Sequence, residues 1–201
     1  MERVGLATPR TLFTNDPERM RAFVSDAGRP CVAKPVGTSI TANPDDPSDT
    51  LVLFTREIGA DSIGDSPGHE ATSPVILQER IDKAFELRAV AYGEEVRFIK
   101  IDSQRDERTR LDFRRRLSDA SLYSMMEDDW ALAERCIAYC RALGLDSGVF
   151  DFAVSPDNQP IFFECNPNGQ WGGMNEAAGG DIDRVAARYI RQRVDHACAR
   201  A

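Results

Sequence analysis

The stretch at residues 149–171, VFDFAVSPDNQPIFFECNPNGQW, constrains the fold of this chain more than any other. Its two runs, VFDFAVS and PIFFEC, alternate and carry many aromatic and β-branched residues, a pattern typical of half-buried β-strands. Asp157 and Asn158 between them favour a tight two-residue turn. The stretch therefore predicts an antiparallel hairpin in which Asp151 lies directly opposite Glu164.

This register places two carboxylates face to face. Like charges directly across an antiparallel pair destabilise it, so a cation is expected between Asp151 and Glu164. Carboxylate and amide oxygens suit Mg²⁺, which usually takes one or two carboxylates. Two alternatives stay open: one carboxylate faces solvent, or the register slips by one residue. Because side chains alternate between the faces of a strand, Phe152, Val154, Ile161 and Phe163 should cover one face, and Asp151, Ala153, Phe162, Glu164 and Asn166 the other.

Composition limits the class of protein. A chain of 201 residues can bury a substantial core in one or two domains. The net charge of −8 argues against nonspecific binding to nucleic acid or to an anionic membrane. The sequence contains no signal peptide and no long apolar span, and its five cysteines suit a reducing compartment, which predicts a cytoplasmic protein. Cys136 and Cys140, one helical turn apart, either pack in the core or bind a soft metal.

The order of elements predicts an α+β fold rather than a doubly wound parallel sheet. Capped amphipathic patterns predict helices over 15–28, 128–144 and 181–199. Apolar runs predict strands at 30–35, 50–55 and 73–81, and a hairpin over 86–104 turns around Gly93 and Glu94. Gly/Pro/Asp/Ser-rich stretches at 37–49 and 59–74 predict loops, and an arginine-rich segment spans 105–116.

Several polar residues in these elements suit an anionic ligand. Lys34 lies within an apolar strand, where it either reaches the surface along its own stem or binds an anion such as phosphate. Glu79 and the nearby backbone at the end of the 73–81 strand could bond the edge of a heterocycle. Arg88 and Arg114 have the planar fork that suits phosphate oxygens, although arginines in such runs are commonly solvated.

In combination, these motifs resemble the ATP-grasp superfamily. The motifs are PRTLFTNDPE, VAKP, ILQERI, ELRAVAYGEEV, KIDSQ, LDFRR, LGLDSGVFDF and FFECNPNGQW, which cover nearly the whole chain. Within the superfamily, the sequence looks like the ligases that crosslink ribosomal peptides (microviridin-type or graspetide macrocyclases), and more distantly like ribosomal-protein glutamate ligases. The resemblance implies an ATP-grasp fold of two α+β lobes clasping ATP, with a small lobe at 1–80 and a large lobe at 81–201.

The same resemblance implies roles for individual residues. Lys34 would bind the ATP phosphates, and Arg88 and Arg114 would face the phosphate or acyl phosphate as catalytic groups. One or two Mg²⁺ ions, with Mn²⁺ as an alternative, would be held by Asp151, Glu164 and Asn166. The adenine base would lie against Gln78, Glu79, Arg80 and Ile81.

The activity implied is formation of an amide or ester through an acyl phosphate, on a precursor peptide that carries a leader. The arginine-rich segment would then either contact an acidic peptide or form a solvated loop. Relatives usually have a complete domain ahead of PRTLFT, and this domain is not apparent in this sequence. In addition, Gly173 stands where relatives have an aromatic residue and Gly180 where they have a leucine. These two glycines predict a looser wall behind the metal site. We therefore also consider three alternatives: a non-catalytic nucleotide- or peptide-binding remnant, a fragment that needs a separate N-terminal-domain partner, and a structural domain with a stabilising ion. The chain could also form a homo-oligomer.

Overall fold

The computed structural model describes residues 4–37, 40–42, 46, 50–63, 73–127 and 129–200, which form two compact units. Unit 1 contains residues 1–8, 82–106 and 116–201, and unit 2 contains residues 9–81 and 107–115. The chain therefore passes between the units at four points. That these units are ATP-grasp lobes with a boundary near residue 80 stays a prediction.

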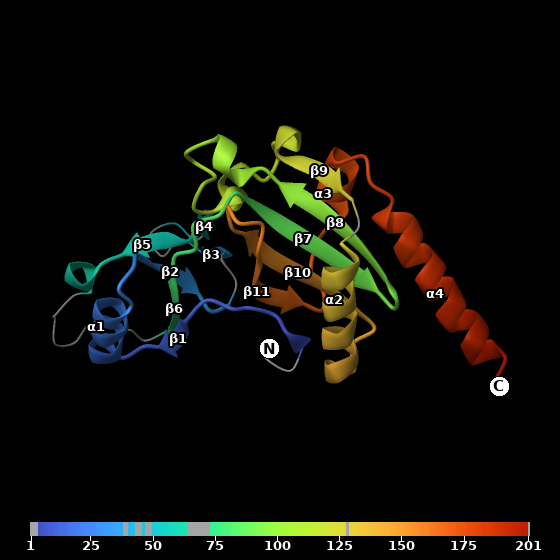
Figure 1. Ribbon diagram of the computed structural model, residues 1–201, viewed down its shortest axis with the longest axis horizontal. Helices are drawn as coiled ribbons and strands as arrows, with labels where there is room; N and C mark the ends of the chain where they lie inside the picture. The colour runs from blue at the N-terminus through green and yellow to red at the C-terminus, as the bar shows by residue number, and fades with distance from the viewer. Residues whose placement is uncertain are drawn as a thin grey trace. The chain divides into compact units, whose positions relative to one another are not determined.

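Unit 1 is built on a five-stranded antiparallel sheet with the order β11-β10-β7-β8-β9 (Figure 1). The hairpin of β7 and β8 turns at Gly93 and Glu94, and Gly93 has a φ of +60°, which favours glycine. The 3-10 helices η3 (Ser103–Arg105) and η5 (Ala120–Leu122) of this unit precede β9 in the chain, and η4 (Phe113–Arg116), between them in sequence, belongs mostly to unit 2. The strands are β7 (Phe85–Tyr92), β8 (Glu95–Ile101), β9 (Tyr123–Met126), β10 (Ser147–Val154) and β11 (Pro160–Asn166).

Helix α2 (Trp130–Leu143) covers one face of this sheet (Figure 1). The side chain of Asp129 accepts a hydrogen bond from Leu132 N and caps the helix start, and Gly144 ends it in the left-handed conformation. The buried face of α2 meets a cluster of aromatic rings from the two carboxylate-bearing strands. This core contains Tyr139, Phe150, Phe152 and Phe162, whose ring centroids lie 5.4 to 6.3 Å apart.

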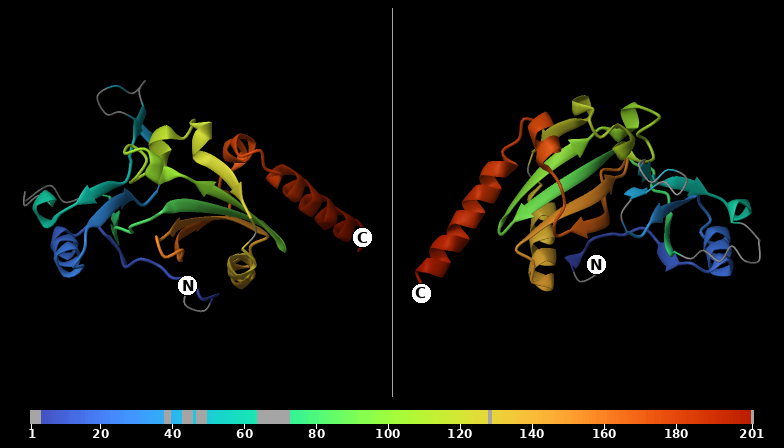
Figure 2. Two further views of the ribbon diagram at one scale, coloured as in Figure 1. Left: turned by 45° about the horizontal axis from the view of Figure 1, so that its top comes forward. Right: turned by 180° about the vertical axis from the view of Figure 1, so that it is seen from behind.

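Helices α3 (Gly172–Ala177) and α4 (Ile182–Cys198) complete unit 1. Met174 of α3 meets Arg88, whose side chain points away from the α2 face, so α3 lies on the opposite face of the sheet. The start of α4 is buried through Ile182, Val185 and Ala186. Residues 190–200 are all exposed, and the C-terminal end of α4 projects beyond the sheet (Figures 1 and 2).

Unit 2 contains a four-stranded antiparallel sheet with the order β1-β6-β2-β5, and α1 (Pro17–Asp26) packs on one of its faces (Figure 2). Asp16 caps this helix by accepting from the backbone amides of Glu18 and Arg19. The strands are β1 (Thr11–Thr14), β2 (Cys31–Pro35), β5 (Arg56–Ile58) and β6 (Val75–Glu79), with β3 (Ile40–Ala42) and β4 (Thr50–Val52) as a separate pair and η2 (Ala60–Ser62) as a 3-10 turn.

The α+β prediction is confirmed, because the pairings between the described strands are antiparallel, apart from an isolated parallel bridge of Ala7 to Ile161, and α-helices pack on the sheets of both units. The three predicted helices all exist, and their ends lie close to the predicted ones. The predicted strand at 50–55 ends at Val52, and a further strand begins at Arg56. Strands β3 and β9 and helix α3 were not predicted, and much of the predicted loops at 37–49 and 59–74 lies outside the described residues.

The carboxylate hairpin confirms the predicted pair, since Asp151 lies opposite Glu164. Two irregularities were missed. The turn contains residues 155–159 instead of two residues, so Val154 pairs with Pro160 rather than with Ile161, and a β-bulge at Phe163 then restores the register. The face predictions for Phe162 and Ile161 are therefore wrong: the Phe162 ring packs with Phe152 in the core, away from Asp151, and Ile161 pairs with Ala153 instead of sharing the face of Phe152.

Among the described residues, no helix combines the length and the apolar composition needed to cross a bilayer.

Candidate functional site

A cross-strand row of three charged residues lies on the face of the unit 1 sheet opposite α2. Asp151 on β10 pairs directly with Arg88 on β7 and with Glu164 on β11. The Arg88 guanidinium binds both carboxylate oxygens of Asp151, with Nε to Oδ1 and Nη2 to Oδ2 each at 2.9 Å. The side chains of Arg88 and Asp151 are 14% and 19% exposed, so this bidentate pair is largely shielded from water.

The segment after the hairpin holds the same guanidinium from another direction. Arg88 Nη1 donates to the backbone carbonyl of Gln170 at 2.7 Å and lies 3.6 Å from the sulfur of Met174. Trp171 anchors this segment, because its indole nitrogen donates to the Tyr92 hydroxyl at 3.2 Å. Burial alone would lower the pKa of Arg88. The charges of Asp151 and Glu164 and the hydrogen bonds to Asp151 outweigh burial, so the pKa of Arg88 is raised above its ordinary value.

Glu164 and Asn166 lie on the same side of β11. Between them, Cys165 packs against the core on the α2 face, and both Glu164 and Asn166 are exposed. The carboxylates of Asp151 and Glu164 and the amide oxygen of Asn166 therefore lie on one face and are hard oxygen donors. An ionised carboxylate has about four lone-pair sites, so Asp151 can accept from Arg88 and still bind a cation. These residues fit Mg²⁺.

The described part of the chain has no cluster of three or more His, Cys, Asp or Glu side chains suited to a metal ion. A cation at Asp151 and Glu164 therefore needs further oxygen ligands, such as Asn166, water or phosphate. The thiols of Cys136 and Cys140 are buried against the sheet, and burial raises the pKa of both and raises that of nearby Cys165 to about 12. These cysteines belong to the core.

A close contact after the hairpin fixes the backbone near Asn166. Gly169 N donates to the carbonyl of Asn166 at 3.2 Å. A Cβ atom at Gly169 would lie 2.6 Å from Cβ of Val149 and 3.1 Å from Cβ of Asn166. Glycine is required at this position because the chain folds back directly onto β10.

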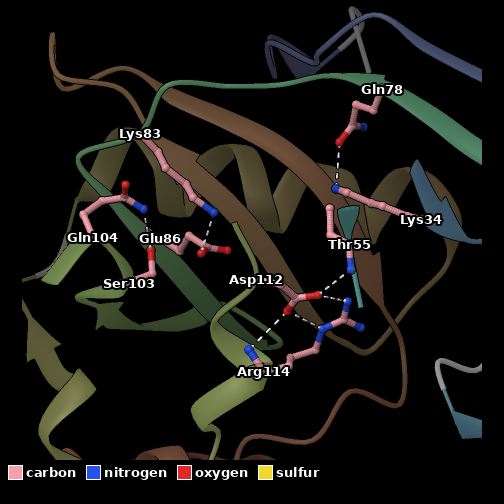
Figure 3. Close-up of polar contacts among 9 residues, drawn as sticks. All are labelled: Lys34, Thr55, Gln78, Lys83, Glu86, Ser103, Gln104, Asp112 and Arg114. Carbon is pink, nitrogen blue, oxygen red and sulfur yellow. Dashed lines mark hydrogen bonds and ion pairs between the residues drawn. The ribbon is translucent and has the colours of Figure 1, made fainter. Parts of the chain in front are cut away.

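Sequence reasoning missed a buried ion pair on the same sheet face. Glu86, two residues before Arg88 on β7, accepts a 2.7 Å hydrogen bond from Lys83 Nζ (Figure 3). Their side chains are 12% and 9% exposed. Burial raises the pKa of Glu86, and Asp151 raises it further, while Lys83 and a hydrogen bond from Ser103 oppose the shift. Ser103 in turn accepts from Gln104 at 3.1 Å. In the sequence, Lys83 and Glu86 look like an ordinary exposed pair three residues apart, so nothing in the sequence indicates that they are buried.

In unit 2, Lys34 and Gln78 lie on the sheet face opposite α1. Lys34 Nζ donates to Gln78 Oε1 at 2.7 Å, and Gln78 Nε2 donates to the hydroxyl of Thr11 at 2.9 Å (Figure 3). The intervening residues Ala33 and Leu77 pack on the α1 side. Lys34 is thus half-buried, and a polar chain across three strands positions its ammonium group.

The predicted adenine-binding residues Gln78, Glu79, Arg80 and Ile81 end strand β6 and the 9–81 segment of unit 2. Two of their backbone amides already have partners, since Glu79 N donates to Arg10 O and Arg80 N donates to Pro30 O. The Arg80 side chain forms an exposed ion pair with Glu57. Any contact of this segment with a base must therefore use other groups, such as the Glu79 side chain or the carbonyls.

Arg114 is held by a buried aspartate that sequence reasoning did not select. Its Nε and Nη2 atoms donate to the two oxygens of Asp112 at 2.8 and 2.6 Å, and the backbone amide of Thr55 donates to Oδ2 at 2.9 Å (Figure 3). Burial raises the pKa of Asp112, but the hydrogen bonds from Arg114 and Thr55 outweigh it and lower the pKa to about 2. Thr109 and Phe113 are buried as well, so the segment 109–114 is not a purely solvated loop.

The two glycine departures behave differently. A Cβ at Gly173 would meet nothing within 4 Å. At Gly180, however, a Cβ would lie 2.3 Å from Oδ1 of Asn175 and 2.6 Å from the sulfur of Met125. Asn175 is buried and accepts from the amide of Ile182 at 3.0 Å, which fixes the start of α4. The expectation of a loosened wall at Gly180 is wrong, because other side chains fill that space.

The structure thus brings Arg88, Asp151, Glu164 and Asn166 together within unit 1. Within unit 2, it brings Lys34 to Gln78 and places Arg114 on Asp112. No protein-family model matches the sequence, and no curated protein matches it either.

Solved structures do match. A RiPP-associated ATP-grasp ligase from Chryseobacterium gregarium, in complex with ADP and with a leader and core peptide, covers 100% of this chain with a TM-score of 0.82 at 23% identity. This chain has the ATP-grasp fold. The macrocyclase MdnC from Microcystis aeruginosa MRC, bound with the precursor peptide MdnA, covers 87% of the chain with a TM-score of 0.70 at 24% identity.

A third neighbour, the ATP-grasp ligase PsnB complexed with a phosphomimetic variant of its minimal precursor, Mg and ADP, covers 96% of the chain with a TM-score of 0.70 at 22% identity. The likeness confirms the predicted fold. This chain spans 57%, 51% and 56% of the length of these three proteins, so the activity, substrates and partners of the whole neighbours are proposals for this chain.

Proposed function

We propose that this chain binds Mg·ATP and takes part in amide or ester formation on a ribosomally made peptide. The observation that carries the proposal is the row of Arg88, Asp151 and Glu164, with Asn166 beside it, in a fold whose solved neighbours include complexes with ADP, with Mg and with precursor peptides. Two carboxylates and an amide on one sheet face are a donor set for a hard divalent cation.

The proposed reaction has two steps. A carboxylate oxygen of the peptide attacks the γ-phosphorus of ATP, the bond to ADP breaks, and an acyl phosphate forms. A lysine amine or a Ser/Thr hydroxyl of the peptide then attacks the acyl carbon, phosphate leaves, and the nucleophile loses a proton. Bound Mg²⁺ would supply positive charge beside the phosphate oxygens, which stabilises the transferred group.

Individual residues have separate parts in this proposal. Asp151, Glu164 and Asn166 hold the cation, and Lys34, positioned by Gln78, binds phosphate oxygens. Arg88, bound to Asp151, and Arg114, positioned by Asp112, offer their guanidinium groups to the phosphate or acyl phosphate. Glu79 and the carbonyls at 78–81 contact the base. The precursor peptide with its leader is the proposed partner, and a homo-oligomer or a separate N-terminal-domain partner stays a prediction.

Calorimetric titration of ATP into the purified chain, with and without Mg²⁺, tests this proposal. The wild type is expected to bind ATP only with Mg²⁺, and Glu164→Ala should weaken that binding at least tenfold, about 1.4 kcal/mol. Asp157→Ala, an exposed carboxylate in the turn of the same hairpin, is the matched control and should bind as the wild type does.

Turnover is tested next, by release of ADP with synthetic peptides that contain Asp/Glu together with Lys, Ser or Thr. ATP binding without ADP release would indicate a nucleotide-binding module rather than a ligase. Absence of ATP binding by the wild type in the presence of Mg²⁺ would contradict the proposal for this chain.

A further inference from the structure

The opposed carboxylates need a balancing charge before a nucleotide arrives, and a cation delivered with that nucleotide cannot supply it. Asp151 lies between Glu164 on one neighbouring strand and Arg88 on the other. Arg88 already binds both oxygens of Asp151, at 2.9 Å each. This guanidinium therefore places a positive charge directly on the carboxylate pair without any bound ion.

The surroundings keep this guanidinium in place. The carbonyl of Gln170 accepts from Nη1 at 2.7 Å, and Met174 packs against the same nitrogen. The Gln170 segment is itself anchored by the hydrogen bond from Trp171 to Tyr92. Contacts from three directions thus hold the Arg88 guanidinium beside Asp151.

We propose that Arg88 is a built-in counterion of the Asp151–Glu164 pair, which stabilises the two carboxylates in the absence of metal and weakens their affinity for a free divalent cation. This inference rests on the proposed cation site. Together, the three side chains carry a formal charge of −1, and a bound divalent ion changes it to +1. The site then favours an ion that arrives with an anionic phosphate over the bare ion, because phosphate offsets the repulsion between the ion and Arg88.

The test measures Mn²⁺ binding without nucleotide, by electron paramagnetic resonance of the free ion, in the wild type, Arg88→Gln and Arg88→Lys. Removing the charge in Arg88→Gln should tighten Mn²⁺ binding at least tenfold. Arg88→Lys keeps the positive charge, so its affinity for Mn²⁺ should lie within about threefold of that of the wild type. Arg97→Gln is the matched control, because Arg97 is a half-buried arginine of the same sheet that pairs with Asp181 and Glu95 instead.

Thermal melting supplies a second readout. Arg88→Gln should melt at a lower temperature than the wild type without metal, because Asp151 loses its bidentate partner, and saturating Mn²⁺ should raise its melting temperature more than that of the wild type. If Arg88→Gln proves too unstable to purify, Arg88→Lys decides the matter: tenfold tighter Mn²⁺ binding in a variant that keeps the charge would overturn the proposal.

The outcomes separate the counterion role from the proposed function. Equal Mn²⁺ affinity in the wild type and Arg88→Gln would overturn the counterion role and leave the cation site intact. Absence of Mn²⁺ binding in all variants, including Arg88→Gln, would overturn the counterion role, while the titration with Mg·ATP decides the proposed function separately. Tighter binding in Arg88→Gln that Glu164→Gln abolishes in the same background would support the counterion role and the cation site.

Discussion

The guanidinium of Arg114 binds both carboxylate oxygens of Asp112, two residues earlier in the chain, at 2.8 and 2.6 Å. The same carboxylate accepts from the backbone of Thr55, 57 residues away in sequence. One buried side chain therefore orients an arginine and joins two distant segments of unit 2. The part of Asp112 in the proposed reaction is to position Arg114.

Asp112→Asn should lower the free energy of unfolding in a pH-dependent way. Because the folded-state pKa is lowered to about 2 from 3.8, the ionised carboxylate contributes stability above about pH 4, and this contribution is lost as the pH falls toward 2. The shift corresponds to about 2 kcal/mol at neutral pH. Urea unfolding at pH 7 and pH 3 measures it, with exposed Asp26→Asn as control, expected to change stability by less than about 1 kcal/mol. A loss that is as large at pH 3 as at pH 7 would argue against this assignment.

Glu86 should give a pH dependence of opposite sign. Its pKa is raised above the ordinary 4.5 by burial, so the folded state favours the protonated form. Relative to Glu86→Gln, which does not titrate, the wild type should lose stability as the pH rises from below 4.5 through the raised pKa. Thermal melts of both proteins across this range test the sign. A wild type that gains stability over the variant with rising pH would show that Lys83 outweighs burial.

Lys34→Met should weaken ATP binding at least tenfold, about 1.4 kcal/mol, because it removes the ammonium that Gln78 orients on the unit 2 sheet face opposite α1. The methionine keeps the apolar stem, so the fold should be retained. Calorimetry with Mg·ATP measures the effect, and Arg56→Met, an exposed cation on the neighbouring strand β5, is the control. Equal losses in both variants would indicate a general charge effect rather than a phosphate contact.

Gly169→Ala should destabilise the chain by about 1–3 kcal/mol, because the new Cβ would overlap Val149. The strain falls next to Asn166, so Mg²⁺-dependent ATP binding should weaken as well. Gly172→Ala, three residues later, meets no atom within 4 Å and should leave both unchanged. Denaturant unfolding and ATP calorimetry of the two variants provide the comparison, and an unaffected Gly169→Ala would rule out the close packing at this position.

The sequence predicted those elements whose signals are local. The caps at Asp16 and Asp129 and the glycine at residue 93 lie within a few residues of the ends they determine, and the structure has the corresponding helices and turn. Strand β9 was missed because its four residues form a strand only through pairing with β8. Helix α3 begins with two glycines, which have low helix propensity, and depends on burial of Met174 and Asn175.

The site shows the same division. The opposition of Asp151 and Glu164 followed from alternation within one hairpin and is confirmed. The contacts of Arg88 with Gln170 and of Asp112 with Thr55 join residues 82 and 57 positions apart, and nothing in the local pattern distinguishes these partners from solvated groups. Sequence reasoning could therefore select the carboxylate pair but not the side chains and carbonyls that position its neighbours.

The bulge at Phe163 has a consequence for how this hairpin tolerates changes in length. The extra residue lies between the turn and Glu164, so the pairing register on the turn side differs by one residue from the register at the carboxylates. An insertion or deletion on the turn side can be absorbed by gain or loss of the bulge. One between Glu164 and Asn166 cannot, since it would turn one oxygen donor toward the aromatic core. Natural length variation in such hairpins should therefore gather on the turn side.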